Sequence, residues 1–134
     1  MQLTNIARDV CEDKDRNRLY IKSDFSAIKE TINDSQIFYQ TSFNSISSIP
    51  LKSRFSVIVA RRVYKKIGDY ILKQKNIENY NKAGKIYVPI IGKIIQTFLS
   101  IFDFIKLLFV KQLVYDNHIN HNILNKEVNL NERI

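Results

Sequence analysis

Two aspartates near the start of the chain, Asp9 and Asp13, have the spacing of a metal-binding pair. Residues four apart lie on the same face of an α-helix, about 6 Å apart along its axis at roughly 1.5 Å per residue. Asn5 lies one turn before Asp9, and Gln2 falls near the same face further back. Mg²⁺ is a hard cation that is held by one or two carboxylates together with waters and phosphate oxygens. The pattern therefore indicates a site for magnesium and a phosphate-bearing ligand. The structural alternative is a charged helix whose acidic side faces water.

Two arginines extend this interpretation, because a guanidinium offers two parallel donors to an oxyanion. Arg8 precedes the first aspartate and Arg18 follows the second, so both are candidates for contacting phosphate. Arg16 and Lys22 lie in the same stretch. For these two, an equally good interpretation is a favourable interaction of cations with the end of a helix.

A helix over the first twenty residues must position these groups. Leu3, Ile6, Ala7 and Val10 supply an apolar stripe beside the polar face, which is the pattern of a wall of a cavity in an α-bundle. Helical periodicity continues downstream. It predicts helices over 24–33, 35–47, 51–75 and 86–114, with a polar turn over 76–84. Only three glycines and two prolines occur, which argues against an all-β fold, so the predicted fold class is all-α.

Composition and charge narrow the class of protein. The 134 residues are 45% hydrophobic and 25% charged, as in a globular domain, and the net charge is +8. A basic chain suits nucleic acid, an anionic membrane surface or phosphorylated substrates. No nucleic-acid motif is present, so we expect no nucleic-acid partner. The single cysteine excludes an internal disulfide. The start of the chain lacks the pattern of a signal peptide, so the expected location is cytoplasmic, with contact at a membrane surface left open.

The segment from Ile86 to Val114 is strongly apolar, but Lys93, Asp103 and Lys106 interrupt it. Its uncharged run over 94–102 is shorter than the roughly 20 apolar residues that a membrane-spanning helix needs. We expect a buried helix, and a helix lying on a membrane surface is the alternative. Beyond it, His118 and His121 form an H-x-x-H pattern with too few neighbouring ligands to predict a metal site.

A longer motif surrounds the aspartates. The stretch from Gln2 to Tyr20 has the pattern Q-L-x-N-I-x-R-D-V-x-E-D followed by R-x-Y. It resembles the second aspartate-rich motif of the squalene/phytoene synthases. The resemblance continues through Ile49-Pro50, Arg54, Tyr64 and Ile67-Gly68, and then through Lys85-Ile86-Tyr87-Val88-Pro89 with Lys93 beyond. It covers residues 1–94, which we interpret as the C-terminal portion of a synthase domain. An apolar helical extension over 95–116 and a flexible polar tail over 117–134 would follow.

The resemblance implies a partial helical bundle of the isoprenoid-synthase type and a transferase reaction of isoprenoid or carotenoid biosynthesis. In that reaction two prenyl diphosphates, farnesyl or geranylgeranyl, condense head to head through a cyclopropylcarbinyl diphosphate. Asp9 and Asp13 would be catalytic ligands of Mg²⁺, with Mn²⁺ as the other candidate ion, and Tyr64 would be the third catalytic residue. The residues implied for substrate or phosphate contact are Gln2, Asn5, Arg8, Arg18, Tyr20 and Lys85.

Two departures from the family pattern limit this expectation. The family's first aspartate-rich motif, D-x-x-x-D, does not occur in this sequence. Lys85 stands where arginine is usual, so a bidentate contact would become a point charge. We therefore expect a truncated or split prenyltransferase that is inactive alone. One alternative is a non-catalytic helical remnant, or a helical protein that binds a membrane or a partner. A third hypothesis is complementation, in which a separate chain carrying D-x-x-x-D supplies the missing motif.

Overall fold

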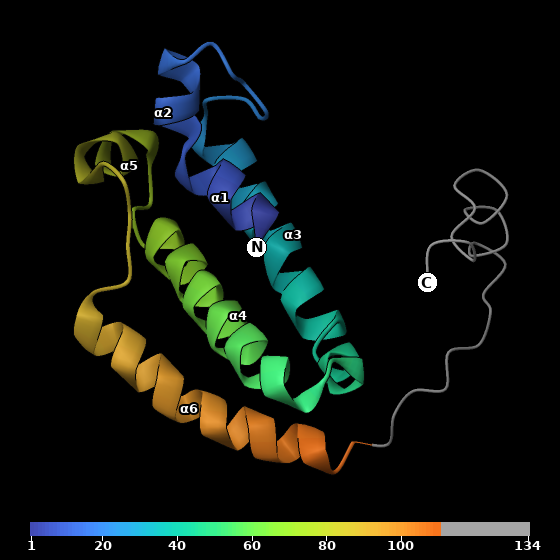
Figure 1. Cartoon of the computed structure of the whole chain (residues 1–134). Helices are drawn as coiled ribbons and strands as arrows, with labels where there is room; N and C mark the ends of the chain where they lie inside the picture. The colour runs from blue at the N-terminus through green and yellow to red at the C-terminus, as the bar shows by residue number, and fades with distance from the viewer. Residues whose placement is uncertain (111–134) are drawn as a thin grey trace, which may run out of the picture.

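A computed structural model of the chain describes residues 1–110, and all of its regular secondary structure in that range is helical (Figure 1). The helices are α1 (Gln2–Arg8), α2 (Val10–Asp15), α3 (Phe25–Thr41), the 3₁₀ helix η1 (Asn44–Ser48), α4 (Leu51–Leu72), α5 (Ile77–Ala83) and α6 (Ile90–Leu108). The predicted all-α fold class is confirmed.

Local sequence signals explain where several helices begin. The Asp24 carboxylate accepts a hydrogen bond from the backbone N–H of Ala27 at 2.8 Å and so caps α3. Asn76 caps α5 in the same way through the N–H of Asn79. Helices α4 and α6 begin directly after Pro50 and Pro89, because proline disfavours helix at the residue before it and its fixed φ suits a helix start.

Helix α4 is the central element, and α1, α3 and α6 all pack against it (Figure 1). The larger core cluster joins α1, α2, α3, α4 and α5 with the segment before α6. Its buried members are Ala7, Val10, Ile28, Ile32, Ile67, Ile71, Tyr80, Ile86 and Val88. A smaller cluster of Ile46, Ile58 and Leu107 joins η1, α4 and α6. The first cluster fixes the position of the aspartate-bearing segment, since Ala7 and Val10 flank Asp9 in the sequence.

The predicted helix over the first twenty residues is shorter and is interrupted at Asp9, whose φ is −102° and ψ is 14°. The hydrogen bonds nevertheless continue through the interruption. The N–H of Asp9 donates to Asn5 O at 2.9 Å, and the N–H of Asp13 donates to Asp9 O at 2.8 Å. The helical path ends at Asp15, and Asn17 then takes a positive φ of 56°, which asparagine tolerates better than most residues. Arg18 and Tyr20 therefore lie in a loop.

Two other predicted boundaries are wrong. Helix α3 runs without a break through 33–35, where two helices were predicted. Ser35 is buried within it, and its hydroxyl donates to Ile32 O at 2.7 Å, so the serine is satisfied inside the helix instead of starting a new one. The segment 76–84, predicted to be a polar turn, contains α5, which buries Tyr80.

The expectation that the apolar segment forms a buried helix is wrong for most of α6. Only Ser100, Asp103 and Leu107 are buried in it, whereas its outer side exposes large apolar residues. These are Ile90, Ile91, Ile94, Ile95, Phe98, Leu99, Ile101, Phe102, Ile105 and Leu108. None of the helices within residues 1–110 is both long enough and apolar enough to cross a membrane.

The predicted domain limits are only partly within the described residues. The boundary between 94 and 95 falls inside α6 and stays a prediction. The end of the apolar extension, the polar tail over 117–134 and the H-x-x-H pattern of His118 and His121 lie outside the described residues.

Candidate functional site

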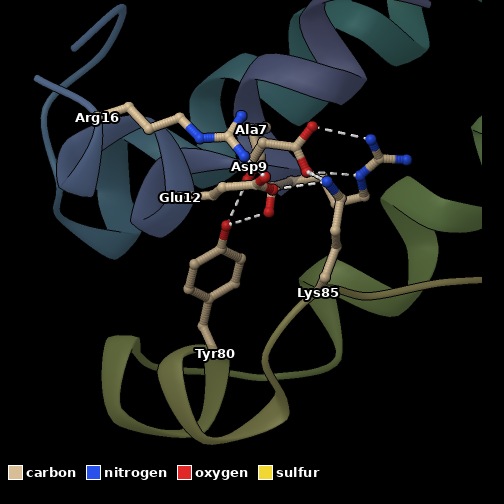
Figure 2. A network of polar contacts seen from close by, with 7 residues as sticks. Ala7, Asp9, Glu12, Arg16, Tyr80 and Lys85 are labelled. Atoms are coloured by element: carbon tan, nitrogen blue, oxygen red, sulfur yellow. Dashed lines mark hydrogen bonds and ion pairs between the residues drawn. The ribbon is translucent and has the colours of Figure 1, made fainter. Parts of the chain in front are cut away.

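Asp9 lies at the centre of a network of ion pairs between α2 and the segment that precedes α6 (Figure 2). Arg8 binds its carboxylate in a bidentate manner, with Nε 2.8 Å from Oδ1 and Nη2 2.8 Å from Oδ2. Lys85 Nζ lies 3.4 Å from Asp9 Oδ1 and 2.6 Å from Glu12 Oε2. Arg16 completes the network by pairing with Glu12 at 2.7 Å. The structure thus brings together Arg8, Asp9 and Lys85, three of the residues predicted for the site.

The network keeps its carboxylates ionised. Burial would raise the pKa of Asp9, but the hydrogen bonds and charge of Arg8, together with Lys85, lower it below its ordinary value. The hydrogen bond from Lys85 and the charge of Arg16 lower the pKa of Glu12. The same contacts raise the pKa of Arg8, chiefly through Asp9, and that of Lys85, chiefly through Glu12. Near neutral pH the cluster therefore consists of paired full charges. An incoming cation or phosphate can replace one partner of such a pair.

Asn5 and Asp13 lie one helical turn on either side of Asp9, and their oxygens have free bonding capacity. Asn5 Oδ1 is buried and has no hydrogen-bond partner in the described structure, which is rare for a buried polar atom. The Asp13 carboxylate has no ion pair within residues 1–110 and borders a shallow depression shared with Leu19 and Tyr20. One amide and two carboxylates are the hard oxygen donors that Mg²⁺ prefers. Among the described residues, no group of three or more His, Cys, Asp or Glu forms a self-sufficient metal site.

Tyr80 contacts the backbone of the segment that carries Asp9. It was not identified from the sequence, because the segment that forms α5 was predicted to be a turn. Its hydroxyl donates to the carbonyl oxygens of Ala7 at 2.9 Å and Arg8 at 2.7 Å (Figure 2). Burial raises the pKa of this hydroxyl, so it remains a donor. The signal that identifies the helix is Asn76 at the N-cap with Glu78 in the first turn.

Tyr64 lies on α4, where it packs against the core cluster that contains Ala7 and Val10. It is partly buried and close enough to contribute to the raised pKa of Arg8, whose main cause is the hydrogen bond to Asp9. Tyr39, which sequence reasoning did not single out, lies nearby. Its hydroxyl is 2.8 Å from Thr4 Oγ1, and burial raises its pKa. No spacing rule connects Tyr39 to the motif, because α3 reaches α1 only through tertiary packing.

Three predicted residues are not brought to the Asp9 carboxylate. Gln2 is exposed and borders an apolar groove of about 360 Å³ that also includes Met1, Leu3, Ser35 and Phe38. Arg18 is exposed and forms no ion pair within residues 1–110, although its backbone N–H donates to Asp13 O at 2.7 Å. Tyr20 is 63% exposed and lies near Asp13 only.

Comparison with known proteins finds two curated relatives that share one name. The chain is 30% identical over 88 residues to the 15-cis-phytoene synthase of Enterobacter agglomerans, a match covering 50% of this chain and 30% of that enzyme. It is 26% identical over 88 residues to the 15-cis-phytoene synthase of Pantoea ananas, covering 50% of this chain and 28% of the enzyme. No family model matches, and no solved structure matches. The chain spans less than a third of the length of these relatives, and 50% of its own length is distantly similar to phytoene synthases.

Proposed function

We propose that this chain forms the second-aspartate part of a phytoene synthase-like prenyltransferase site, which binds the diphosphate of farnesyl or geranylgeranyl diphosphate. The observation that carries the proposal is the position of Lys85. It lies far along the sequence from the aspartate-rich motif, yet its ammonium group contacts both Asp9 and Glu12. The two stretches that resemble the synthases thus meet at one cluster of charges, and distant similarity to phytoene synthases supports the same assignment.

The proposed roles follow from the geometry. Asp9 and Asp13 would hold Mg²⁺ or Mn²⁺, with Asn5 Oδ1 as an adjacent oxygen donor. The bound ion would supply positive charge that stabilises a departing diphosphate. Arg8 and Lys85 now neutralise Asp9. If a cation took over that role, the N–H groups of Arg8 and Lys85 would be available to phosphate oxygens, Arg8 as a fork and Lys85 as a point charge.

Two adjoining apolar pockets near the start of α1 suit a prenyl chain. The groove beside Gln2 shares Met1 and Phe38 with a second apolar pocket of about 310 Å³. Ile46, Ile49 and Val57 line the far part of that pocket. A prenyl chain buried there gains about 0.8 kcal/mol per CH₂ removed from water, and the apolar walls keep water from a carbocation.

Condensation of two prenyl diphosphates uses two aspartate-rich motifs in the family that the sequence resembles. This sequence holds one, so we propose that a segment carrying D-x-x-x-D, in the same protein or in a second one, completes the site. Without that segment two substrates are not oriented, and orientation can contribute several kcal/mol of barrier lowering.

Product formation tests the proposal. The chain is incubated with Mg²⁺ and farnesyl or geranylgeranyl diphosphate, either alone or with a fragment of the Enterobacter agglomerans enzyme that lacks the aligned region. Mass spectrometry then looks for C30 or C40 hydrocarbon and the cyclopropyl intermediate. We expect product only in the mixture, lost in Asp9→Ala/Asp13→Ala and kept in Asp15→Ala, which removes an exposed carboxylate from the same helix. Product that survives the double substitution contradicts the assigned roles.

A helical protein that binds a membrane surface or a partner is the second candidate, and the exposed apolar side of α6 favours it. This function requires α6 but not the aspartates. Phe98→Ser/Phe102→Ser would then abolish sedimentation with lipid vesicles, whereas Asp9→Ala/Asp13→Ala would leave it unchanged. The reverse pattern excludes this candidate.

A further inference from the structure

A basic cleft of about 400 Å³ lies between α4 and α6 and shares no residue with the Asp9 network. Its charged lining comes from four cations and two carboxylates. These are Arg61, Arg62, Lys65, Lys66, Asp69 and Asp103. The cleft therefore carries a formal charge of +2 (four minus two) in a partly enclosed space.

Existing contacts hold both arginines in place. Arg61 donates from Nε and Nη2 to Tyr39 O at 2.8 and 2.6 Å, and its guanidinium lies over the Phe43 ring at 4.6 Å. Arg62 Nε donates to Asp103 Oδ2 at 2.6 Å. Donors fixed in this way lose little conformational freedom when a ligand binds.

The carboxylates do not neutralise the cleft. Asp103 is shared between Arg62 and Arg61, whose Nη1 lies 4.0 Å away. Asp69 pairs with Lys66 at 3.5 Å, and Lys65 forms no ion pair within residues 1–110. Burial lowers the pKa of Arg61 despite the charge of Asp103, as expected for a desolvated cation without full compensation. Arg61, Arg62 and Lys65 thus retain unused N–H donors that face one space.

We propose that this cleft binds a phosphate or diphosphate group, as a second anion site that needs no metal ion. The ligand class follows from the donors, because the remaining N–H groups of two guanidinium groups and two ammonium groups match a multiply charged oxyanion. The volume is within the range of small-molecule sites. A soluble phosphorylated compound and a phospholipid headgroup present the same chemistry. Leu99 lines the cleft and belongs to the exposed apolar side of α6, so a headgroup is reachable from a membrane surface.

Titration with inorganic pyrophosphate, in EDTA to remove divalent ions, tests the site. The heat of binding and the amide NMR shifts of the full chain are measured together. We expect saturable binding that shifts the signals of Arg62, Lys65 and Gln96. Lys65→Gln/Lys66→Gln should weaken it at least about tenfold, since each hydrogen bond between charged groups that is lost contributes roughly that factor. Lys52→Gln, an exposed lysine of α4 outside the cleft, should have no effect.

A variant that is expected to bind pyrophosphate more tightly separates loss of the site from misfolding, because a misfolded chain would not gain affinity. Asp69→Asn removes one negative charge and frees Lys66, so it should tighten pyrophosphate binding severalfold. Vesicles of phosphatidic acid, compared with phosphatidylcholine, form the lipid arm. If only the acidic vesicles bind, and binding falls in Lys65→Gln/Lys66→Gln, the site holds a headgroup. If neither probe binds, or if Lys52→Gln weakens binding as much as the cleft variants, the proposal is overturned.

Discussion

At the scale of single residues, Tyr80 connects α5 to the aspartate-bearing segment through one hydroxyl. It donates to two buried or partly buried carbonyl oxygens, Ala7 O and Arg8 O. We expect Tyr80→Phe to lower the free energy of unfolding by about 1–3 kcal/mol, because the two acceptors share one hydroxyl proton and lose it in a buried or partly buried position. Urea unfolding measures this change. Tyr87→Phe is the control, since Tyr87 is 58% exposed. Equal stability of Tyr80→Phe and the wild type contradicts the proposed role.

Asp9 makes the free energy of unfolding depend on pH in the acidic range. Its pKa is lower in the folded chain than its ordinary value, as is that of Glu12, so the unfolded chain takes up protons more readily. The stability contributed by these carboxylates is present above the ordinary carboxylate range, about pH 4. It is lost as the pH falls through the folded-state pKa values. Urea midpoints measured from about pH 6 to about pH 3 should fall more steeply for wild type than for Asp9→Asn. Equally steep curves would be inconsistent with the Arg8 and Lys85 contacts.

The sequence predicted part of this cluster. Asp9 and Asp13 share a helical path as their spacing indicated, and Arg8 contacts its neighbour. Lys85 was placed at the site only through the resemblance, because no local rule relates residues so far apart. The supporting contacts of Tyr80 and Tyr39 depend on how α5 and α3 pack against α1. They were not predictable from spacing.

At the scale of elements, the contact between α4 and α6 depends on Asp103. This side chain is nearly buried, lies 2.6 Å from Arg62 and shares its charge with Arg61. Asp103→Asn leaves two partly buried guanidinium groups without a full counter-charge, so we expect a loss of about 2–4 kcal/mol in unfolding free energy. Thermal unfolding followed by circular dichroism measures it. Asp34→Asn on the exposed side of α3 is the control, and a loss no larger than in this control would contradict the role of Asp103.

The errors in predicted elements have identifiable physical causes. Ser35 suggested a helix start, but a serine inside a helix can bond to the preceding turn, as it does here with Ile32 O. The segment 76–84 was too polar to show a helical period, yet the buried Tyr80 anchors a short helix there. Apolar composition predicted a buried α6, whereas burial depends on which elements cover it, and α4 and η1 cover only one side.

At the scale of the whole molecule, the structure has two charged regions that differ in their balance of acidic and basic groups. The Asp9 network at one end combines carboxylates with Arg8 and Lys85, whereas the cleft beside α6 has a net positive charge. The fold class was predictable because glycine and proline are scarce and apolar residues recur with a helical period. The arrangement of the two regions was not, since it depends on tertiary contacts of α4 with α1, α3, α6 and η1.

Magnesium-dependent binding of geranylgeranyl diphosphate is the measurement that tests the central claim most directly. The lipid diphosphate is titrated into the full chain with Mg²⁺ and with EDTA, and the same is done with Asp9→Asn/Asp13→Asn and with Lys65→Gln/Lys66→Gln. We expect Mg²⁺ to tighten binding to the wild type and to the lysine variant by at least about tenfold, as two carboxylate ligands allow. The aspartate variant should show no such gain. If that variant gains as much from Mg²⁺ as the wild type, the metal-binding role of the aspartates is wrong.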